Sequence, residues 1–255
     1  MKKYPADIMA VDIGNTSVKT YLADPFDKCA TLECMRTSSV AEAAERARLL
    51  GIEKVAYLTT RKLTKDERNI VRDNGWWEFT SRSKVPMEVC YDLSTLGPDR
   101  LALAVACSSE FNEEGCLIVD AGTALTIDLI SCSGEYLGGT ISPGMRMRFK
   151  ALNKFTSRLP YVEGGVLERR FGQNTQDAIM GGVIMGIVGE IVLAYKDAVK
   201  MLGIESMVIT GGDSEFLAET VARYILDDCE NIKRILMEEG IVGMGLIEAY
   251  MYNHD

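Results

Sequence analysis

Two stretches of the chain join an apolar run to an acidic, glycine-containing turn and then to a second apolar run. They read IMAVDIGNTSVKTYL over residues 8–22 and CLIVDAGTALTIDLI over residues 116–130. An aspartate at such a strand end repels a phosphate, but it can hold a cation that bridges to phosphates. The glycine lets a phosphate approach the backbone closely, and the threonine adds a hydroxyl donor. We therefore expect two turns that face each other and clamp a nucleoside triphosphate and its metal.

The alternative is that each stretch is an ordinary hairpin turn, where Asp, Gly and Asn are common. Repetition in like contexts argues against it, as does a third glycine-rich turn, ITGGD over residues 209–213, on which adenosine could lie flat. Two phosphate turns and one adenosine turn resemble the actin, hexokinase and Hsp70 ATPase superfamily. The resemblance implies a duplicated ribonuclease-H-like, actin-like ATPase fold, with two α/β domains and mixed sheets.

Composition excludes several other classes. The formal net charge of −9 argues against nucleic-acid binding, because a basic surface supplies most non-specific phosphate affinity. No run approaches 18 consecutive apolar residues and no secretory signal is visible, so we expect no membrane span and a cytoplasmic location. The seven cysteines are scattered without a C-x-x-C pair, which favours buried thiols over a zinc site. The single histidine, His254, lies in an expected frayed tail, so acid–base chemistry falls to other side chains.

Strand and helix patterns alternate along the chain, which favours α/β layers. Strands are expected at residues 7–14, 17–24, 54–60, 77–80, 85–90, 115–122, 124–130 and 206–210. Helices are expected at residues 41–50, 99–111, 145–156, 174–201 and 241–252. Two more are expected, one from a cap at Thr64 to an end at Gly75, and one directly after the Gly-Gly turn of ITGGD. Residues 134–148 are expected to be a Gly-Pro-rich connection. The predicted domains are residues 1–115 and 116–255, and the last helix could pack back on the first domain.

Four further stretches narrow the family. They are GPDR at 97–100, VDAGTALTIDLI at 119–130, YLGGTISPG at 136–144 and FGQNT at 171–175. Together with DIGNTSVK at 12–19, they closely resemble type III pantothenate kinase. The resemblance implies ATP-dependent phosphorylation of pantothenate to 4′-phosphopantothenate, the first step of coenzyme A biosynthesis. A P-loop kinase is disfavoured because G-x-x-x-x-G-K-[ST] is absent, and no histidine forms the protein-kinase H-R-D.

The resemblance also implies roles for matching residues. Asp99 is the expected general base, although an aspartate there could equally be a helix N-cap. The expected substrate contacts are Tyr91, Gly97, Pro98, Asp99, Arg100 and, across a homodimer interface, Thr175. Tyr91 could instead be a core aromatic residue. The expected ATP contacts are Asp12, Ile13, Gly14, Asn15, Thr16, Ser17, Val18, Lys19 and Thr123. Asp12 is expected near Mg²⁺, and Asp120 is the expected ligand of a monovalent cation, K⁺ or NH₄⁺.

Two other functions remain open from the sequence. One is a kinase for another small hydroxyl substrate, although the C-x-C-G cluster usual in zinc-containing sugar kinases is absent. The other is a non-catalytic ATP-binding regulator, against which the GPDR match argues. The basic run from Arg146 to Arg158 could be a solvated face, a contact to anionic ligands or a contact to a partner subunit. We expect the Gly-rich helix after Asn174 at the homodimer interface.

Overall fold

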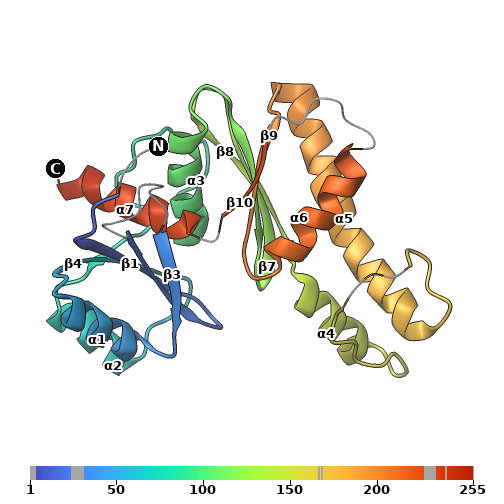
Figure 1. Ribbon diagram of the computed structural model, residues 1–255, viewed down its shortest axis with the longest axis horizontal. Coiled ribbons are helices and arrows are strands. Elements are labelled where there is room, and N and C mark those ends of the chain that lie inside the picture. Colours follow the sequence, from blue (N-terminus) through green and yellow to red (C-terminus); the bar gives the residue numbers. More distant parts are fainter. Residues whose placement is uncertain are drawn as a thin grey trace. The chain divides into compact units, whose positions relative to one another are not determined.

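The structure is a computed structural model that describes residues 4–23, 32–165, 167, 169–226, 234–238 and 240–254. The chain divides into two compact units. Unit 1 comprises Met1–Asn112, Gly134–Tyr136 and Glu239–Asp255, and unit 2 comprises Glu113–Ser133 and Leu137–Glu238. Each unit is built around one five-stranded sheet (Figure 1).

The sheet of unit 1 has the strand order β3-β2-β1-β4-β5. Its strands are β1 (Ile8–Ile13), β2 (Val18–Ala23), β3 (Leu32–Thr37), β4 (Lys54–Thr59) and β5 (Trp77–Glu78). The first three strands are antiparallel neighbours, whereas β4 runs parallel to β1 and β5 parallel to β4. The parallel pairing places Thr59 beside Ile13, so the end of β4 lies beside the turn that follows β1.

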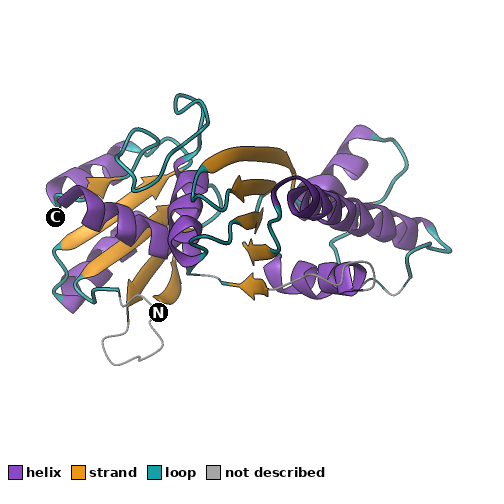
Figure 2. Cartoon of the chain, turned by 90° about the horizontal axis from the view of Figure 1, so that it is seen from above, coloured by secondary structure: helices purple, strands orange, loops and turns teal. Residues whose placement is uncertain are grey.

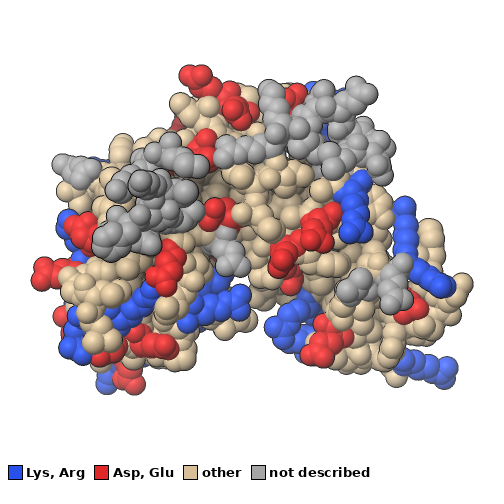
Figure 3. Space-filling view, viewed as in Figure 1, with Lys and Arg blue, Asp and Glu red and all other residues tan. Residues whose placement is uncertain are grey.

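Helices cover both faces of this sheet (Figures 1 and 2). They are α1 (Val40–Leu50), α2 (Lys65–Asp73), α3 (Pro98–Glu110) and α7 (Ile241–His254). Helices α3 and α7 pack against each other, and α7 lies along β1. Helix α2 begins with a capping box in which Thr64 and Glu67 bond reciprocally to each other's backbone N–H. The region of α1 and α2 carries basic and acidic side chains interspersed (Figure 3), several in ion pairs.

The sheet of unit 2 repeats this topology. Its strands are β6 (Cys116–Ala121), β7 (Ala124–Ile130), β8 (Tyr136–Pro143), β9 (Ser206–Thr210) and β10 (Arg234–Met237), in the order β10-β9-β6-β7-β8. Strand β6 pairs antiparallel with β7 and parallel with β9, as β1 does with β2 and β4. Each repeat runs three strands, helical structure, a strand, a helix, a strand and a helix. The expected duplicated ribonuclease-H-like fold is confirmed.

Three helices of unit 2 pack against its sheet and one another: α4 (Met145–Phe155), α5 (Thr175–Leu202) and α6 (Ser214–Leu226) (Figure 2). By length and composition alone, α5 could cross a membrane, unlike the expectation from the sequence. However, its buried residues, among them Ile184, Ile187 and Ile191, belong to the hydrophobic core that includes β6 and β7. We therefore assign α5 to the core of unit 2.

Most expected elements are present, and three expectations are wrong. Residues 134–148 are not a loop throughout, because Tyr136–Pro143 form β8 despite their glycines. Residues 85–90 form no strand, only an isolated parallel bridge between Val89 and Tyr136. His254 is not in a frayed tail but in α7, where its ring stacks on Tyr250 at 4.0 Å. The edge strands β3 and β10 had no counterpart among the expected strands.

Candidate active site

The first acidic turn lies between β1 and β2 of unit 1. Asp12 is the fifth residue of β1, paired across the sheet with Lys19 on β2 and, on the other side, with Leu58 on β4. The Gly14 N–H donates to the Ser17 carbonyl at 3.0 Å and closes the turn. Asn15 at its tip is exposed. The turn therefore presents backbone to an incoming ligand beside a half-buried carboxylate.

The GPDR stretch forms the N-terminus of α3 in the same unit. Gly97 is the N-cap, Pro98 the first helical residue and Asp99 the second, so Asp99 is not the cap. The Arg100 N–H donates to Asp99 Oδ1 at 2.9 Å. A Cβ atom on residue 97 would lie only 2.4 Å from that oxygen. A side chain at residue 97 would therefore displace the Asp99 carboxylate from its position at the helix N-terminus, where the macrodipole favours an anion.

Asp12 and Asp99 interact electrostatically. The pKa of Asp12 is raised to about 6, chiefly by burial; Lys19 opposes the rise, and the negative charge of Asp99 adds to it. The Asp12 carboxylate provides a hard oxygen ligand of the kind that Mg²⁺ prefers, with water and phosphate completing the shell, and Asp99 adds negative charge nearby. The donor set of this site therefore fits a divalent cation.

A pocket of about 400 Å³ lies beside Asp99. It is lined by Thr59, Thr60, Arg61, Lys62, Gly97, Pro98 and Asp99. The sequence analysis did not predict four of these residues, which come from the end of β4 and the loop after it: Thr59, Thr60, Arg61 and Lys62. The signal that could have found them is the parallel pairing of β4 with β1, since the carboxyl ends of parallel neighbours lie at the same sheet edge.

Tyr91 is joined to this site through Arg100. The Arg100 guanidinium lies over the Tyr91 ring, 5.3 Å from its centroid, and Arg100 is buried. Tyr136 packs edge-on against Tyr91 at 5.8 Å, and its carbonyl accepts from the Cys90 N–H. The Tyr91 side chain is half-buried, unlike the fully buried Tyr136.

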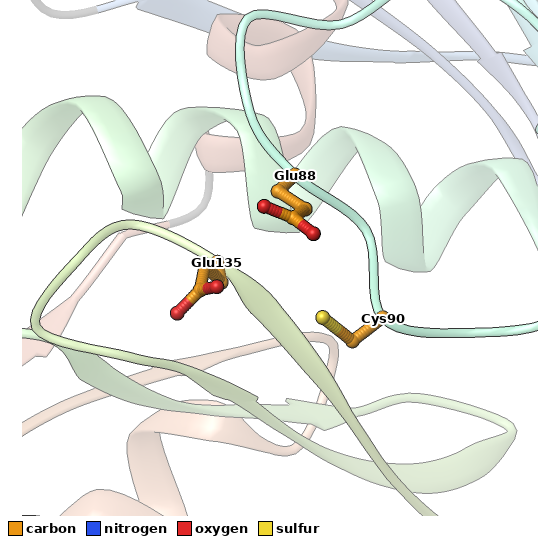
Figure 4. A group of neighbouring side chains, drawn as sticks. All are labelled: Glu88, Cys90 and Glu135. Atoms are coloured by element: carbon orange, nitrogen blue, oxygen red, sulfur yellow. The ribbon is translucent and has the colours of Figure 1, made fainter.

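Glu88 and Cys90 lie just before Tyr91 in the chain, and the Glu135 side chain lies near theirs (Figure 4). Their ligand atoms lie within 4.8 Å of one another, from the loop before Tyr91 and the turn before β8. Glu88 and Cys90 are exposed. Exposed acidic groups often gather without an ion, so we assign no metal to this group.

The second acidic turn lies between β6 and β7 of unit 2. Asp120 is the fifth residue of β6 and pairs across the sheet with Thr126. The Gly122 N–H donates to the Ala124 carbonyl at 3.1 Å, while Thr123 at the tip is exposed. Both turns are closed by the N–H of the glycine two residues after the aspartate. The second turn is one residue shorter, because it joins Ala121 to Leu125 whereas the first joins Ile13 to Val18.

Two other segments of unit 2 pack against this turn. The Gly144 N–H, at the N-cap of α4, donates to the Thr123 carbonyl at 3.2 Å. A Cβ atom on residue 144 would lie 2.4 Å from the Gly122 carbonyl oxygen, so only glycine permits this approach. In the ITGGD turn, the Asp213 N–H donates to the Ala121 carbonyl at 3.1 Å. The second acidic turn, the start of α4 and the ITGGD turn therefore form one group.

Two residues of the basic run on α4 interact with other residues of unit 2. Arg148 donates to the Pro143 carbonyl at 2.7 Å and to Ser142 Oγ at 3.0 Å, and it pairs with Glu190 of α5 at 2.8 Å. Arg146 lies near enough to Asp213 to oppose the rise in the pKa of that carboxyl, which burial causes. Arg148 therefore joins α4 to β8 and α5, while Arg146 places positive charge near the ITGGD turn.

Thr175 is not part of the second acidic turn but lies further along the sequence, at the start of α5. It is the exposed first residue of α5, after an N-cap in which Asn174 Oδ1 accepts from the Asp177 N–H at 3.0 Å. Tyr91, Gly97, Asp99 and Arg100 belong to unit 1 together with the first turn, whereas Asp120, Thr123 and Thr175 belong to unit 2.

Residues 8–197 match the family model described as type III pantothenate kinase. The chain belongs to the type III pantothenate kinase family. A curated type III pantothenate kinase from Porphyromonas gingivalis is 41% identical over 176 residues, which cover 68% of each chain.

Solved structures extend the likeness of this type III pantothenate kinase family member to nearly the whole chain. A Campylobacter jejuni protein assigned to the Baf family of transcriptional activators is 26% identical with a TM-score of 0.60, covering 96% of this chain and 98% of that one. A glucokinase from an Antarctic psychrotroph matches with a TM-score of 0.50 at 11% identity, covering 97% and 98%. The glucokinase shows the fold alone, an α/β fold of two domains.

Proposed function

We propose that this chain transfers the γ-phosphoryl group of ATP to the primary hydroxyl of pantothenate, giving ADP and 4′-phosphopantothenate. The observation that carries the proposal is that Asp99 lies at a pocket and close enough to Asp12 for the two carboxylates to interact electrostatically, in a chain of the type III pantothenate kinase family. The pocket of about 400 Å³ lies within the range of small-molecule sites.

Asp99 is the proposed general base. Its carboxylate would accept the proton of the acceptor hydroxyl as that oxygen attacks phosphorus, and the bond to the ADP oxygen breaks. Arg100 and the backbone of Gly97 and Pro98 would hold the acceptor, with the Tyr91 ring beside Arg100. Because phosphoryl transfer depends chiefly on positioning and charge stabilisation, these contacts matter as much as the base.

The two acidic turns are the proposed phosphate contacts. In the first, the residues from Asp12 to Lys19 would bind the nucleotide, with Asp12 as a ligand of the divalent metal or of its water. That metal, when bound, would neutralise the charge of the phosphates. In the second, Thr123 would contact ATP, and the neighbouring ITGGD turn would receive adenosine.

A monovalent cation is proposed at Asp120. Lys19 stands across the sheet from Asp12, whereas the equivalent partner of Asp120 is Thr126, which carries no charge. A K⁺ or NH₄⁺ ion would supply in unit 2 the positive charge that Lys19 supplies in unit 1. Carboxylate and carbonyl oxygens are suitable ligands for such a hard cation.

A homodimer is proposed from the outer face of unit 2. Leu193 and Met201 of α5 are 62% and 75% exposed, and Gly182 and Gly189, earlier in the same helix, have open space around them. Small residues beside exposed apolar ones suit close helix packing against a second copy, and exposed apolar surface of this kind marks interfaces. Thr175 at the start of α5 would then contact the partner's acceptor.

We also propose a cytoplasmic location.

The proposal is tested by ADP release from purified protein with ATP and Mg²⁺, each with pantothenate, with a panel of sugars, or with no acceptor. We expect ADP release that depends on pantothenate and a product heavier by one phosphate in mass spectrometry. Release with a sugar instead would indicate a kinase of another hydroxyl substrate. Nucleotide binding with no turnover would favour a regulator, the class to which the Campylobacter jejuni structure is assigned.

A further inference from the structure

One arginine connects the first phosphate turn to the start of α2. Arg61 Nε donates to the Gly14 carbonyl at 3.0 Å, and its two terminal nitrogens donate to Glu67 at 2.9 and 2.7 Å. The Arg61 side chain is 25% exposed and that of Glu67 17%. A guanidinium held on both sides in this way has little freedom to leave the turn, because its planar fork fixes the directions of its donors.

Glu67 is itself fixed in place. It accepts from the Thr64 N–H at 2.8 Å within the capping box of α2. Arg61 is the main cause that lowers the pKa of Glu67 to about 2, so the ion pair persists over the whole pH range in which the protein would be assayed. Helix α2 therefore provides a rigid, permanently charged support for Arg61.

The backbone of the β4 end is tied to the same turn. Thr59 Oγ1 lies 3.2 Å from the Ile13 carbonyl and 2.8 Å from the Arg61 carbonyl, and the Thr60 N–H donates to Ile13 at 3.3 Å. The backbone and the side chain of the Thr59–Arg61 segment thus contact two successive carbonyls, those of Ile13 and Gly14. The segment also lines the pocket beside Asp99.

The contact to Gly14 has a consequence for ligand binding. In a trans peptide the carbonyl of one residue and the N–H of the next point in opposite directions in one plane. A donor that holds the Gly14 carbonyl therefore sets the direction of the Asn15 N–H at the exposed tip of the turn. Backbone N–H groups in such turns donate hydrogen bonds to phosphate oxygens.

We propose that Arg61, held by Glu67, is a positioning residue that orients the Gly14–Asn15 peptide for binding of the nucleotide phosphates. The proposal rests on the assignment of this turn to phosphate binding and deepens it. Neither residue is assigned a contact to the reacting atoms. Arg61 also lines the pocket beside Asp99, but its guanidinium is engaged by the Gly14 carbonyl and by Glu67.

The test measures nucleotide affinity without turnover, using the non-hydrolysable ATP analogue AMPPNP with Mg²⁺ in isothermal titration calorimetry. We expect Arg61→Met to weaken AMPPNP binding about 10- to 100-fold, the usual effect of losing a charge-assisted hydrogen bond. Glu67→Gln, which keeps the cap but loses the charge, should give a smaller loss. Arg72→Met is the matched control, because Arg72 pairs with Asp73 on the exposed face of the same helix and should leave affinity unchanged.

Two further readouts separate positioning from general loss of structure. The Asn15 amide resonance in ¹⁵N-labelled protein should shift in Arg61→Met and not in Arg72→Met. The KM for ATP should rise more than the KM for pantothenate, although Arg61 also lines the pocket beside Asp99. If Arg61→Met does not fold, Arg61→Lys and Glu67→Gln carry the same comparison.

An AMPPNP affinity within twofold of the wild type in a folded Arg61→Met variant would overturn the proposal. So would equal weakening of both substrates together with a lowered melting temperature, which would indicate a purely structural ion pair. Failure of the wild type to turn over pantothenate would instead contradict the proposed function and leave this binding test intact.

Discussion

Asp12 and Asp120 occupy the same position in the two repeats. Each is the fifth residue of the six-residue strand that opens its sheet, with four buried residues before it and one after it. They differ in the residue across the strand pair, which is Lys19 for Asp12 and Thr126 for Asp120. The duplicated fold therefore presents two equivalent carboxylates, of which only the first has a basic residue as its cross-strand partner.

This difference predicts a cation requirement that depends on Asp120. Replacing Asp120 by Ala should flatten the dependence of rate on K⁺ or NH₄⁺, because the proposed oxygen ligand is lost. The measurement is a titration of ADP release against KCl and NH₄Cl at constant ionic strength, with NaCl as the balance. Asp128→Asn is unsuitable as a control because Asp128 is fully buried, so the exposed Asp73→Asn serves instead. An unchanged titration in Asp120→Ala would remove the assigned role.

We expect the buried Asp12 carboxylate to lower the stability of the fold while it serves nucleotide binding. Its folded pKa of about 6 exceeds the ordinary value of 3.8, so the folded state binds the proton more tightly than the unfolded state. Above pH 6 the carboxylate is ionised in both states, and folding is destabilised by about 2 to 3 kcal/mol. The destabilisation fades as the pH falls through 6 and is gone below about 4.

Asp12→Asn should therefore melt higher than the wild type at pH 8, by about 4 to 10 °C, in metal-free buffer. The gain should shrink at pH 5, and Mg²⁺-AMPPNP binding should be lost at both pH values. Differential scanning calorimetry at the two pH values is the measurement. A melting temperature lowered at pH 8 would show that burial of the Asp12 charge is not unfavourable.

Gly144 predicts a steric effect at the second turn. A methyl group there would press on the Gly122 and Thr123 carbonyl oxygens, which lie 2.4 and 2.6 Å from the Cβ position. Gly144→Ala should lower stability by about 1 to 3 kcal/mol and raise the KM for ATP more than that for pantothenate. Glu219→Ala, at an exposed position of α6, is the control and should leave stability and both KM values unchanged. Equal KM values in wild type and Gly144→Ala would contradict the close packing of α4 on this turn.

The exposed apolar face of α5 predicts the oligomeric state. Leu193→Glu combined with Met201→Glu should convert a dimer to a monomer, because two charges would be buried at the proposed interface. Leu49→Glu on α1, a residue 70% exposed, is the control and should leave the dimer intact. Size-exclusion chromatography with light scattering measures the mass. A wild-type protein that is monomeric and fully active would contradict both the interface and the cross-subunit role of Thr175.

The strands and helices with strong periodicity were predictable from the sequence, and the irregular ones were not. The hairpins around Asp12 and Asp120 and the Thr64 cap of α2 are local features, and the structure confirms them. Strand β8 was missed because Gly138, Gly139 and Pro143 are typical of loops. Gly139 is nevertheless required within the sheet, because a side chain there would meet the Ile127 carbonyl.

The candidate site was predictable only where its residues are close in sequence. The two acidic turns were found by their repeated local pattern and the GPDR stretch by its resemblance to the family, and their assigned roles remain predictions. Arg61 was missed because its partners, Gly14 and Glu67, reach it only through the pairing of β4 with β1 and the capping of α2. The packing of Gly144 on Thr123 is likewise a tertiary contact without a local pattern.

The central claim is that Asp99 acts as the base in pantothenate phosphorylation. The most direct test compares wild type with Asp99→Asn in steady-state ADP release with ATP, Mg²⁺ and pantothenate, with AMPPNP affinity measured in parallel. We expect kcat to fall about 10²- to 10⁴-fold while nucleotide affinity stays within about threefold, because the amide cannot accept the hydroxyl proton. An Asp99→Asn variant with wild-type kcat, or a wild type without pantothenate-dependent turnover, would contradict the claim.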